Sequence, residues 1–398
     1  MKTSLAIRVG LSVMLFWGGV NVAGAEGNTF SHPGMLSTEA DFSKARELVN
    51  SNNAPAASLA IESWNKLTNS AFARSTYQPH AVSYVIRGNP SWGKDNYQLL
   101  YRDAAAAYQL AVRWKITKDD QYADAAIRIL DAWATTLGGI GGTSDKYLAS
   151  GIYGYQLANA AEIMRTYSRW DGLSVFQNMM LNVFYPMNHN FITQHNGYGD
   201  AGLHYWANWD LANLASMMSI GILTDRHDIY QEALNYIKSG KGNGAFNNTM
   251  WQVYPEEGLA QVQESGRDQG HSTLDIALIG VICQMAWNQG DDLFGFNDNL
   301  VLKGTEYVAK YNLGYDVPWT TYRYVDGWVQ TTVSSASRGN LRPAWTLIYN
   351  HYVRVKGMKA TYTKEMMDRV GAEGGGGNYG PNSGGFDQPG FGSLLFNQ

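Results

Sequence analysis

The 398-residue sequence predicts an all-α fold, an α/α toroid built as an incomplete barrel of antiparallel helix pairs. Apolar residues recur at helical spacing through most of the chain, as at Ala104, Tyr108, Ala111 and Trp114. Short and long connections alternate between these segments, which is typical of paired helices. The chain has no strict internal repeat, and this favours a closed ring over a superhelical solenoid.

The individual helices follow from the same periodicity, taken in order along the chain. They are predicted over residues 41–50, 56–67, 101–114, 122–132, 156–168, 174–184, 205–223, 229–237, 271–288, 300–310 and 342–356. Pro343 suits the first turn of the last of them. Gly-rich or polar loops are expected over 138–147, 240–247 and 312–341, and almost no strand pattern is evident. The Gly-rich run 371–392 is expected to form a tail or to wrap the surface.

The first 25 residues have the organisation of a secretory signal peptide. Lys2 and Arg8 give a positive region, residues 9–20 are apolar, and Ala23-Gly24-Ala25 is a small-residue cleavage signal. Residues 26–398 are then expected to form a single domain with no membrane span. The lone Cys283 excludes an internal disulfide, so an exported protein of this kind suits a bacterial periplasm, or secretion from a bacterium.

Composition narrows the functional class. With 45% hydrophobic and 16% charged residues, the chain is neither disordered nor a coiled coil. The formal net charge of −4 argues against nucleic acid as a partner. The 13 Trp and 25 Tyr residues are numerous enough to line a sugar-binding groove, although packing in a helical core accounts for most of them.

Three segments place polar side chains at predicted helix starts, and a toroid can gather such starts at one mouth. They are 204–211 with Asn208, 263–271 with Glu264, Arg267 and His271, and 322–343 with Tyr322, Tyr324, Arg338 and Arg342.

These groups suit β-elimination at a uronic acid, in which a base removes the hydrogen next to a carboxylate and an acid protonates the leaving oxygen. Asn208, helped by Arg338 or Arg342, is expected to neutralise the carboxylate. A protonated Glu264 is a further candidate for that contact. His271 is a natural base, and a tyrosine can serve as base or acid.

The chain resembles the alginate-lyase-like polysaccharide lyases, most closely polysaccharide lyase family 38, from the helix at 101–106 to residues 349–352. The most specific segments are Tyr205-Trp206-Ala207-Asn208-Trp209-Asp210-Leu211, Glu264-Ser265-Gly266-Arg267-Asp268-Gln269-Gly270-His271 and Arg338-Gly339-Asn340-Leu341-Arg342-Pro343. The resemblance implies an α/α toroid that cleaves β-1,4-linked polyuronates, alginate or glucuronan, and leaves 4,5-unsaturated ends. It places the family's carboxylate-binding Asn on Asn208, its Glu on Glu264 and its His on His271, with a catalytic Tyr and a supporting Arg further along.

Two departures from the related family 5 alginate lyases bear on the roles of these residues. Those enzymes have an Asn-His pair where this chain has Asn208-Trp209, and a Tyr where it has His271. This favours a division of labour between His271 and a tyrosine. Tyr322, beside Arg323, is the preferred tyrosine; Tyr324 comes next, and Tyr349 is expected to belong to the core.

Other interpretations of the same residues stay open at this point. His271 and Asn208 could be helix caps, Glu264 and Arg267 could pair with each other at i, i+3, and Arg338 and Arg342 could be surface residues. A glycoside hydrolase would use two carboxylates from Asp210, Glu256, Glu257 and Asp268, and a periplasmic sugar-binding protein would be non-catalytic. No metal-binding or cofactor motif is present, so we expect a monomeric, metal-independent and cofactor-free lyase acting on an acidic polysaccharide.

Overall fold

The computed structural model describes residues 29–51, 54–91, 93–199, 203–376 and 386–396. The predicted signal peptide at 1–25 and part of the predicted tail at 371–392 lie outside these ranges. The helices are α1 (Glu39–Asn50), α2 (Ala54–Asn69), α3 (Tyr97–Thr117), α4 (Asp120–Thr136), α5 (Lys146–Leu148), α6 (Gly154–Met164), α7 (Leu173–Met179), α8 (Tyr185–Gln194), α9 (Ala207–Leu223), α10 (His227–Ser239), α11 (Phe246–Thr249), α12 (Gln269–Asn288), α13 (Phe296–Asn312), α14 (Trp345–Tyr349), α15 (Thr361–Val370) and α16 (Gly392–Leu395).

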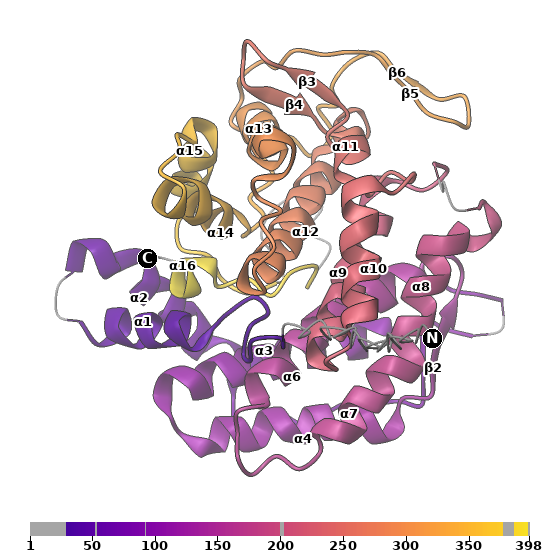
Figure 1. Ribbon diagram of the computed structural model, residues 1–398. Coiled ribbons are helices and arrows are strands. Elements are labelled where there is room, and N and C mark those ends of the chain that lie inside the picture. The colour runs from indigo at the N-terminus through magenta and orange to yellow at the C-terminus, as the bar shows by residue number, and fades with distance from the viewer. Residues whose placement is uncertain (1–28, 52–53, 92, 200–202, 377–385, 397–398) are drawn as a thin grey trace, which may run out of the picture.

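The long helices form a curved double layer (Figure 1). Helices α3, α6, α9 and α12 pack against one another in that order, and α14 continues the row beyond α12. Four of these five helices have an outer partner named here: α4 covers α3, α10 covers α9, α13 covers α12, and α15 covers both α13 and α14. The inner helices therefore carry the core, and their ends and connecting loops are left to form a site.

The connection between α3 and α4 illustrates why the chain turns back so sharply. Lys118 adopts a left-handed conformation with φ 60° and ends α3, and its N–H bonds the carbonyl of Trp114. Asp119 follows immediately, and its side chain accepts the N–H of Gln121 to cap α4. Two residues thus supply both the stop and the start signal of an antiparallel helix pair.

The inner helices are apolar on every side, which is the pattern of a helix buried all round. Every residue of α6 is buried, and so are nearly all residues of α9 and α12. Gly151 lies in the π-helical segment η2 (Ala149–Tyr153), where a Cβ atom would come within 2.7 Å of the backbone of Ala212 in α9. Close contact between these two elements therefore requires glycine at that position.

Three short two-stranded sheets are found in the described part of the chain, in regions where no helix was predicted. Strand β1 (Tyr84–Arg87) pairs in parallel with β2 (Gly139–Gly142), so the predicted loop 138–147 contains a strand. The glycines of β2 gave no strand pattern in the sequence, because glycine is generally depleted from strands. Two antiparallel pairs are β3 (Gln252–Tyr254) with β4 (Leu259–Gln261), and β5 (Tyr322–Arg323) with β6 (Val329–Gln330).

The segment after α15 joins the two ends of the helical layer. Helix α16 packs against α2 and α14, and Figure 1 shows it between them. The buried carboxylate of Glu373 accepts the backbone N–H groups of Trp345 and Thr346, at 2.9 Å each, and so caps α14. Helix α14 starts at Trp345, so the prediction that Pro343 lies in its first turn is wrong. Helices α8 and α15 were not predicted either.

Candidate active site

A cavity of about 410 Å³ lies where the N-terminal ends of α9 and α12 meet η2, β1 and the C-terminal segment. Its lining combines two arginines, two aspartates, a histidine and an amide with a few apolar side chains. The lining residues are Arg87, Leu148, Ile152, Asn208, Asp268, Gly270, His271, Leu274, Arg342 and Asp387. All three predicted segments therefore reach one cavity, through Asn208, His271 and Arg342.

The start of α9 is held by the two residues Gln263 and Glu264. The first N–H groups of a helix have no partner within the helix, and here side chains from the other segment supply them. Gln263 Oε1 accepts the N–H of Ala207 at 3.1 Å, and Glu264 Oε1 accepts the N–H of Asn208 at 2.9 Å. These contacts fix the cavity-lining Asn208 relative to the start of α12.

Glu264 also orients the side chain of Asn208. Its Oε1 accepts the amide Nδ2 of Asn208 at 2.5 Å, while its Oε2 accepts Arg267 Nη1 at 2.8 Å. Glu264 is fully buried and is not among the cavity-lining residues. Both oxygens of Glu264 are thus engaged as acceptors by groups of the protein itself. The predicted contact of a protonated Glu264 with substrate is therefore not what the geometry indicates; Glu264 positions Asn208, and the i, i+3 pairing with Arg267 is present.

A second carboxyl group, Asp275, lies one helical turn beyond His271 and was not identified from the sequence. Burial and the nearby charge of Glu264 raise the pKa of Asp275 well above its usual range, so this carboxyl group is neutral.

His271 lines the cavity and is paired with Asp268. The Nδ1 of His271 lies 2.6 Å from Asp268 Oδ2, and its backbone N–H donates to Asp268 Oδ1 at 2.8 Å. Burial opposes ionisation of Asp268, but its hydrogen bond to His271 and the charges of His271 and Arg267 outweigh burial and hold its pKa below the usual value. With an ionised Asp268 accepting from Nδ1–H, the other nitrogen of His271 carries the lone pair of a base.

A stack of three side chains lies beside the Asp268–His271 pair. Its members are Arg267, Trp206 and Tyr324. The guanidinium of Arg267 lies 5.0 Å from the centre of the Trp206 ring, whose other neighbour, the ring of Tyr324, is stacked at 4.6 Å. Burial raises the pKa of Tyr324 far above its usual value, with smaller contributions from nearby negative charges. Tyr324 is thus a neutral packing group that joins the β5–β6 hairpin to Trp206.

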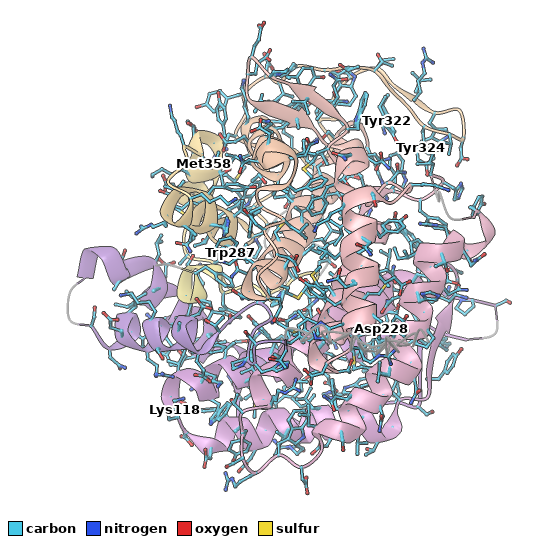
Figure 2. All side chains as sticks on the ribbon, in the orientation of Figure 1. Lys118, Asp228, Trp287, Tyr322, Tyr324 and Met358 are labelled. Atoms are coloured by element: carbon cyan, nitrogen blue, oxygen red, sulfur yellow. The ribbon has the colours of Figure 1, made fainter. Side chains whose placement is uncertain are left out.

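Tyr322 is linked to the start of α9 through Gln263. Gln263 Nε2 donates to the Tyr322 hydroxyl at 3.1 Å, while Gln263 Oε1 holds the N–H of Ala207. Figure 2 shows Tyr322 and Tyr324 at the β5–β6 hairpin, above α9. Burial raises the pKa of Tyr322, and the charge of Glu264 raises it further, so the hydroxyl keeps its proton at neutral pH. Tyr322 is not among the residues that line the cavity.

The two arginines of the third segment have different surroundings. Arg338 donates to the carbonyls of Tyr311 at 2.7 Å and Tyr315 at 2.8 Å and stacks on the Tyr311 ring. It is not among the cavity-lining residues, so the geometry does not support the predicted contact with substrate. Arg342 does line the cavity, yet it is buried and bonds Gln388, Asp387 and the carbonyl of Gly270. This makes it a support for the cavity wall.

The remaining sequence candidates lie away from this cavity. Tyr349 lines a separate pocket with Arg354 and Lys364. Asp210 is fully buried, where His195 and Tyr236 bond its carboxylate. Glu256 and Glu257 are exposed in the turn between β3 and β4.

Two charged cavity residues, Arg87 and Asp387, were not identified from the sequence. Arg87, at the end of β1, shares the cavity with Asn208 and His271. It follows Tyr84, Val85 and Ile86 in a short segment without helical periodicity, and no local pattern indicated its role. Among the described residues, no group of three or more potential ligands that could hold a metal ion is found. The same part of the chain contains no helix long and apolar enough to cross a bilayer.

The cavity in this helical double layer brings together an amide, an imidazole held by a carboxylate, and arginines. This fold and these groups are those expected of a polysaccharide lyase. The chain belongs to the alginate lyase family, because the family model described as alginate lyase matches residues 42–318. A search of curated proteins finds no significant match.

Solved structures confirm the predicted toroid. Alginate lyase A1-III from Sphingomonas species A1 is 14% identical, covers 92% of this chain and 97% of its own, and gives a TM-score of 0.58. An alginate lyase from Bacteroides ovatus is 11% identical over 85% of this chain and 96% of its own, with a TM-score of 0.55. A variant of alginate lyase A1-III complexed with tetrasaccharide is 14% identical over 93% and 97%, with a TM-score of 0.57. At these identities the likeness concerns the fold.

Proposed function

We propose that this lyase cleaves β-1,4-linked polyuronates, alginate or glucuronan, by β-elimination and leaves 4,5-unsaturated uronate ends. The observation that carries the proposal is the presence of Asn208 and His271 on one cavity, each held by a buried or half-buried carboxylate. The resemblance to polysaccharide lyase family 38 supports the same substrate class. One structural neighbour, a variant of alginate lyase A1-III, is complexed with tetrasaccharide, and a chain-like substrate for this protein is consistent with that complex.

The first requirement of the reaction is neutralisation of the uronate carboxylate, because a charged carboxylate acidifies its neighbouring carbon poorly. The amide of Asn208 has one N–H engaged by Glu264 and a second available for the substrate. Asn208, Gly270 and His271 all lie in the first turns of α9 and α12, where the helix dipoles favour negative charge. Both effects stabilise the anionic intermediate more than the starting carboxylate.

The elimination then needs two proton transfers. His271 takes the proton from C5, the C5–H electron pair forms the C4–C5 double bond, and the C4–O4 bond breaks. Asp268 holds the imidazole and stabilises its protonated form. Tyr322 lies outside the cavity lining, but it bonds Gln263, which holds the start of α9. In this proposal Tyr322, whose raised pKa keeps it protonated, gives its proton to the departing O4 of a chain that extends past the cavity toward the β5–β6 hairpin. The enzyme is restored when His271 loses its proton to solvent and Tyr322 regains one. The sum is then one proton moved from carbon to oxygen and one new double bond, with no water consumed.

A glycoside hydrolase is the alternative, and the environments of the carboxylates disfavour it. A hydrolase needs one acid with a raised pKa and one ionised carboxylate flanking the bond. The cavity carboxylates are Asp268 and Asp387, paired with His271 and Arg342 respectively, and the pKa of Asp268 is lowered. The rival candidate Asp210 is fully buried.

The decisive experiment is an ultraviolet absorbance assay against polymannuronate, polyguluronate and glucuronan, followed by mass spectrometry of the products. A lyase gives an absorbing unsaturated end and products without added water. Products that contain added water and do not absorb would establish hydrolysis instead. The proposal that no metal takes part is checked in the same assay, because activity should survive treatment with EDTA.

We further propose that the protein acts outside the cytoplasm, in the periplasm or medium, as a monomer. The organisation of residues 1–25 supports export. Mass spectrometry of exported protein should find a mature start near Glu26, and an intact Met1 in that material would refute cleavage.

A further inference from the structure

The charged side chains that line the cavity form ion pairs with one another, except Arg87. Asp268 pairs with His271, and Asp387 pairs with Arg342. Arg87 forms no ion pair with a described residue: its hydrogen bond goes from Nη1 to the hydroxyl of Tyr153, at 3.2 Å. Burial opposes the charge of Arg87, but its pKa is raised, because nearby groups that include the Asp387 and Asp145 carboxylates favour the charged form.

Aromatic rings hold Arg87 in place without neutralising it. Its Cζ atom lies 4.9 Å from the centre of the Tyr97 ring and 5.8 Å from that of Tyr153. Tyr153 is fully buried, and burial raises its pKa far above the usual value, so its hydroxyl stays neutral. A cation in a partly closed cavity with only neutral direct partners is a site prepared for an anion.

The backbone at Arg87 is fixed as firmly as its side chain. Strand β1 pairs Arg87 with Gly142 of β2, where a Cβ atom would lie 1.8 Å from the carbonyl oxygen of Arg87. Gly88, the next residue, has φ 102°, which side chains rarely adopt. The glycines that concealed β2 in the sequence therefore allow the close approach that delivers Arg87 to the cavity.

We propose that Arg87 forms a second carboxylate-binding subsite, which receives the uronate adjacent to the one held at Asn208. The inference rests on the proposed polyuronate substrate, because such a polymer carries one carboxylate on every sugar. Asn208 accounts for the carboxylate at the reacting sugar, and Arg87 is the cavity cation left for its neighbour. A guanidinium binds a carboxylate through two parallel hydrogen bonds, so this contact selects a charged sugar over a neutral one.

Binding is measured by calorimetry in a His271→Ala background, with tetrasaccharides of mannuronate, guluronate and glucuronate and with their carboxyl-reduced neutral counterparts. Arg87→Ala should weaken binding of a charged tetrasaccharide by about 10- to 100-fold, the usual loss for a charge-assisted contact. Binding of the neutral counterpart should not change. Arg87→Lys should fall in between, because it keeps the charge and loses the forked geometry. Arg226→Ala is the matched control, since Arg226 is exposed and pairs with Asp228 on the surface.

A double-mutant cycle separates one shared carboxylate from two. If Arg87 and Asn208 bind different carboxylates, the losses from Arg87→Ala and Asn208→Ala add. In the active enzyme, Arg87→Ala should raise KM with little change in kcat, because the neighbouring carboxylate is bound equally before and during reaction. Circular dichroism checks that each variant is folded. If Arg87→Ala does not fold, the affinity of Arg87→Lys tests the proposal instead.

Three outcomes are decisive. Strong non-additivity would place both residues on a single carboxylate and overturn the second subsite. Unchanged affinity in a folded Arg87 variant of an active lyase would also overturn it and leave the proposed function intact. Absence of unsaturated product from the wild-type enzyme on all three polymers would instead refute the proposed function, on which the subsite rests.

Discussion

The carboxylate of Asp268 contacts His271 twice: Oδ1 accepts the backbone N–H at 2.8 Å, and Oδ2 lies 2.6 Å from the imidazole Nδ1. Asp268 thus caps α12 and orients the proposed base with the same side chain. The interpretation of His271 as a helix cap is therefore wrong, because Asp268 does the capping.

The two functions of Asp268 can be separated by substitution. Asp268→Asn should leave stability almost unchanged, because asparagine caps a helix about as well as aspartate. It should lower kcat by at least about tenfold, because it no longer favours the Nδ1–H form of the imidazole. Asp268→Ala should lower kcat as well and cost about 1 kcal/mol of stability. Urea unfolding and absorbance kinetics test this, and equal loss of stability in both variants would contradict it.

His271→Ala should reduce turnover by about 100-fold or more, which is the usual contribution of a general base. KM should change less, because the proton moves only in the transition state. The fold should survive, since the cap at Asp268 remains. Asn208→Ala is the comparison, and it should affect both KM and kcat. Normal turnover in folded His271→Ala enzyme would remove His271 from the mechanism and leave Tyr322 to act as base and acid.

Tyr322→Phe should lower kcat by about 100-fold, as expected for loss of a general acid. Its effect on stability should be small, because the hydrogen bond of its hydroxyl is to the amide of Gln263, a neutral group. Tyr324→Phe is the matched control, since Tyr324 acts through its ring against Trp206 and should retain most activity. If Tyr324→Phe is the inactive variant and Tyr322→Phe is active, the two assignments must be exchanged.

The Glu264–Arg267 pair predicts an asymmetric loss of stability. The side chain of Glu264 is 0% exposed, whereas that of Arg267 is 28% exposed. Arg267→Leu leaves a fully buried carboxylate without its ion-pair partner and should cost about 3–5 kcal/mol. Glu264→Gln leaves a guanidinium that water can partly hydrate, and it should cost only about 1–2 kcal/mol. Urea unfolding measures both, and equal costs would show that burial does not govern this pair.

His351 predicts a pH dependence of stability unrelated to activity. Burial, followed by the positive charge of Lys356, lowers the pKa of His351 from 6.5 to about 4. Its ring is stacked on Phe294, at 3.7 Å between centres. The unfolded chain binds the proton of His351 more readily than the folded protein does. Neutral His351 therefore contributes to the free energy of unfolding in full above pH 6.5, and this contribution is lost as the pH falls toward 4.

Replacement of this histidine isolates the effect. In His351→Phe, the slope of unfolding free energy between these pH values should decrease by up to about 1.4 kcal/mol per pH unit. An identical slope in wild type and His351→Phe would show that His351 does not titrate differently on folding.

Sequence periodicity was sufficient for the helical architecture because the inner helices bury their surfaces on every side. It failed where secondary structure depends on distant partners. Strand β2 exists through its pairing with β1, and α14 starts where Glu373 caps it, three residues later than the sequence indicated. Such contacts join positions far apart in the chain, and no local pattern records them.

In the candidate site, too, the sequence predicted what depends on local pattern and not what depends on contacts between distant segments. Asn208 and His271 were identified because each begins a long apolar helix, and those helices pack side by side. Arg338 was misplaced because a polar segment next to a helix start does not determine where a guanidinium points. Arg87 was missed because its neighbours in space come from three other parts of the chain: Tyr153, Asn208 and Asp387.

The π-helical segment η2 restricts how this family can change in length. A π turn holds one residue more than an α turn, so deleting a single residue from 149–153 would restore regular winding to the helix that continues into α6. Every side chain before the deletion would then rotate by about 100° relative to those after it. Ile152 would leave the cavity wall, and Tyr153 would leave Arg87. Insertions and deletions among working relatives should therefore avoid this segment and accumulate in the loops at the outer surface.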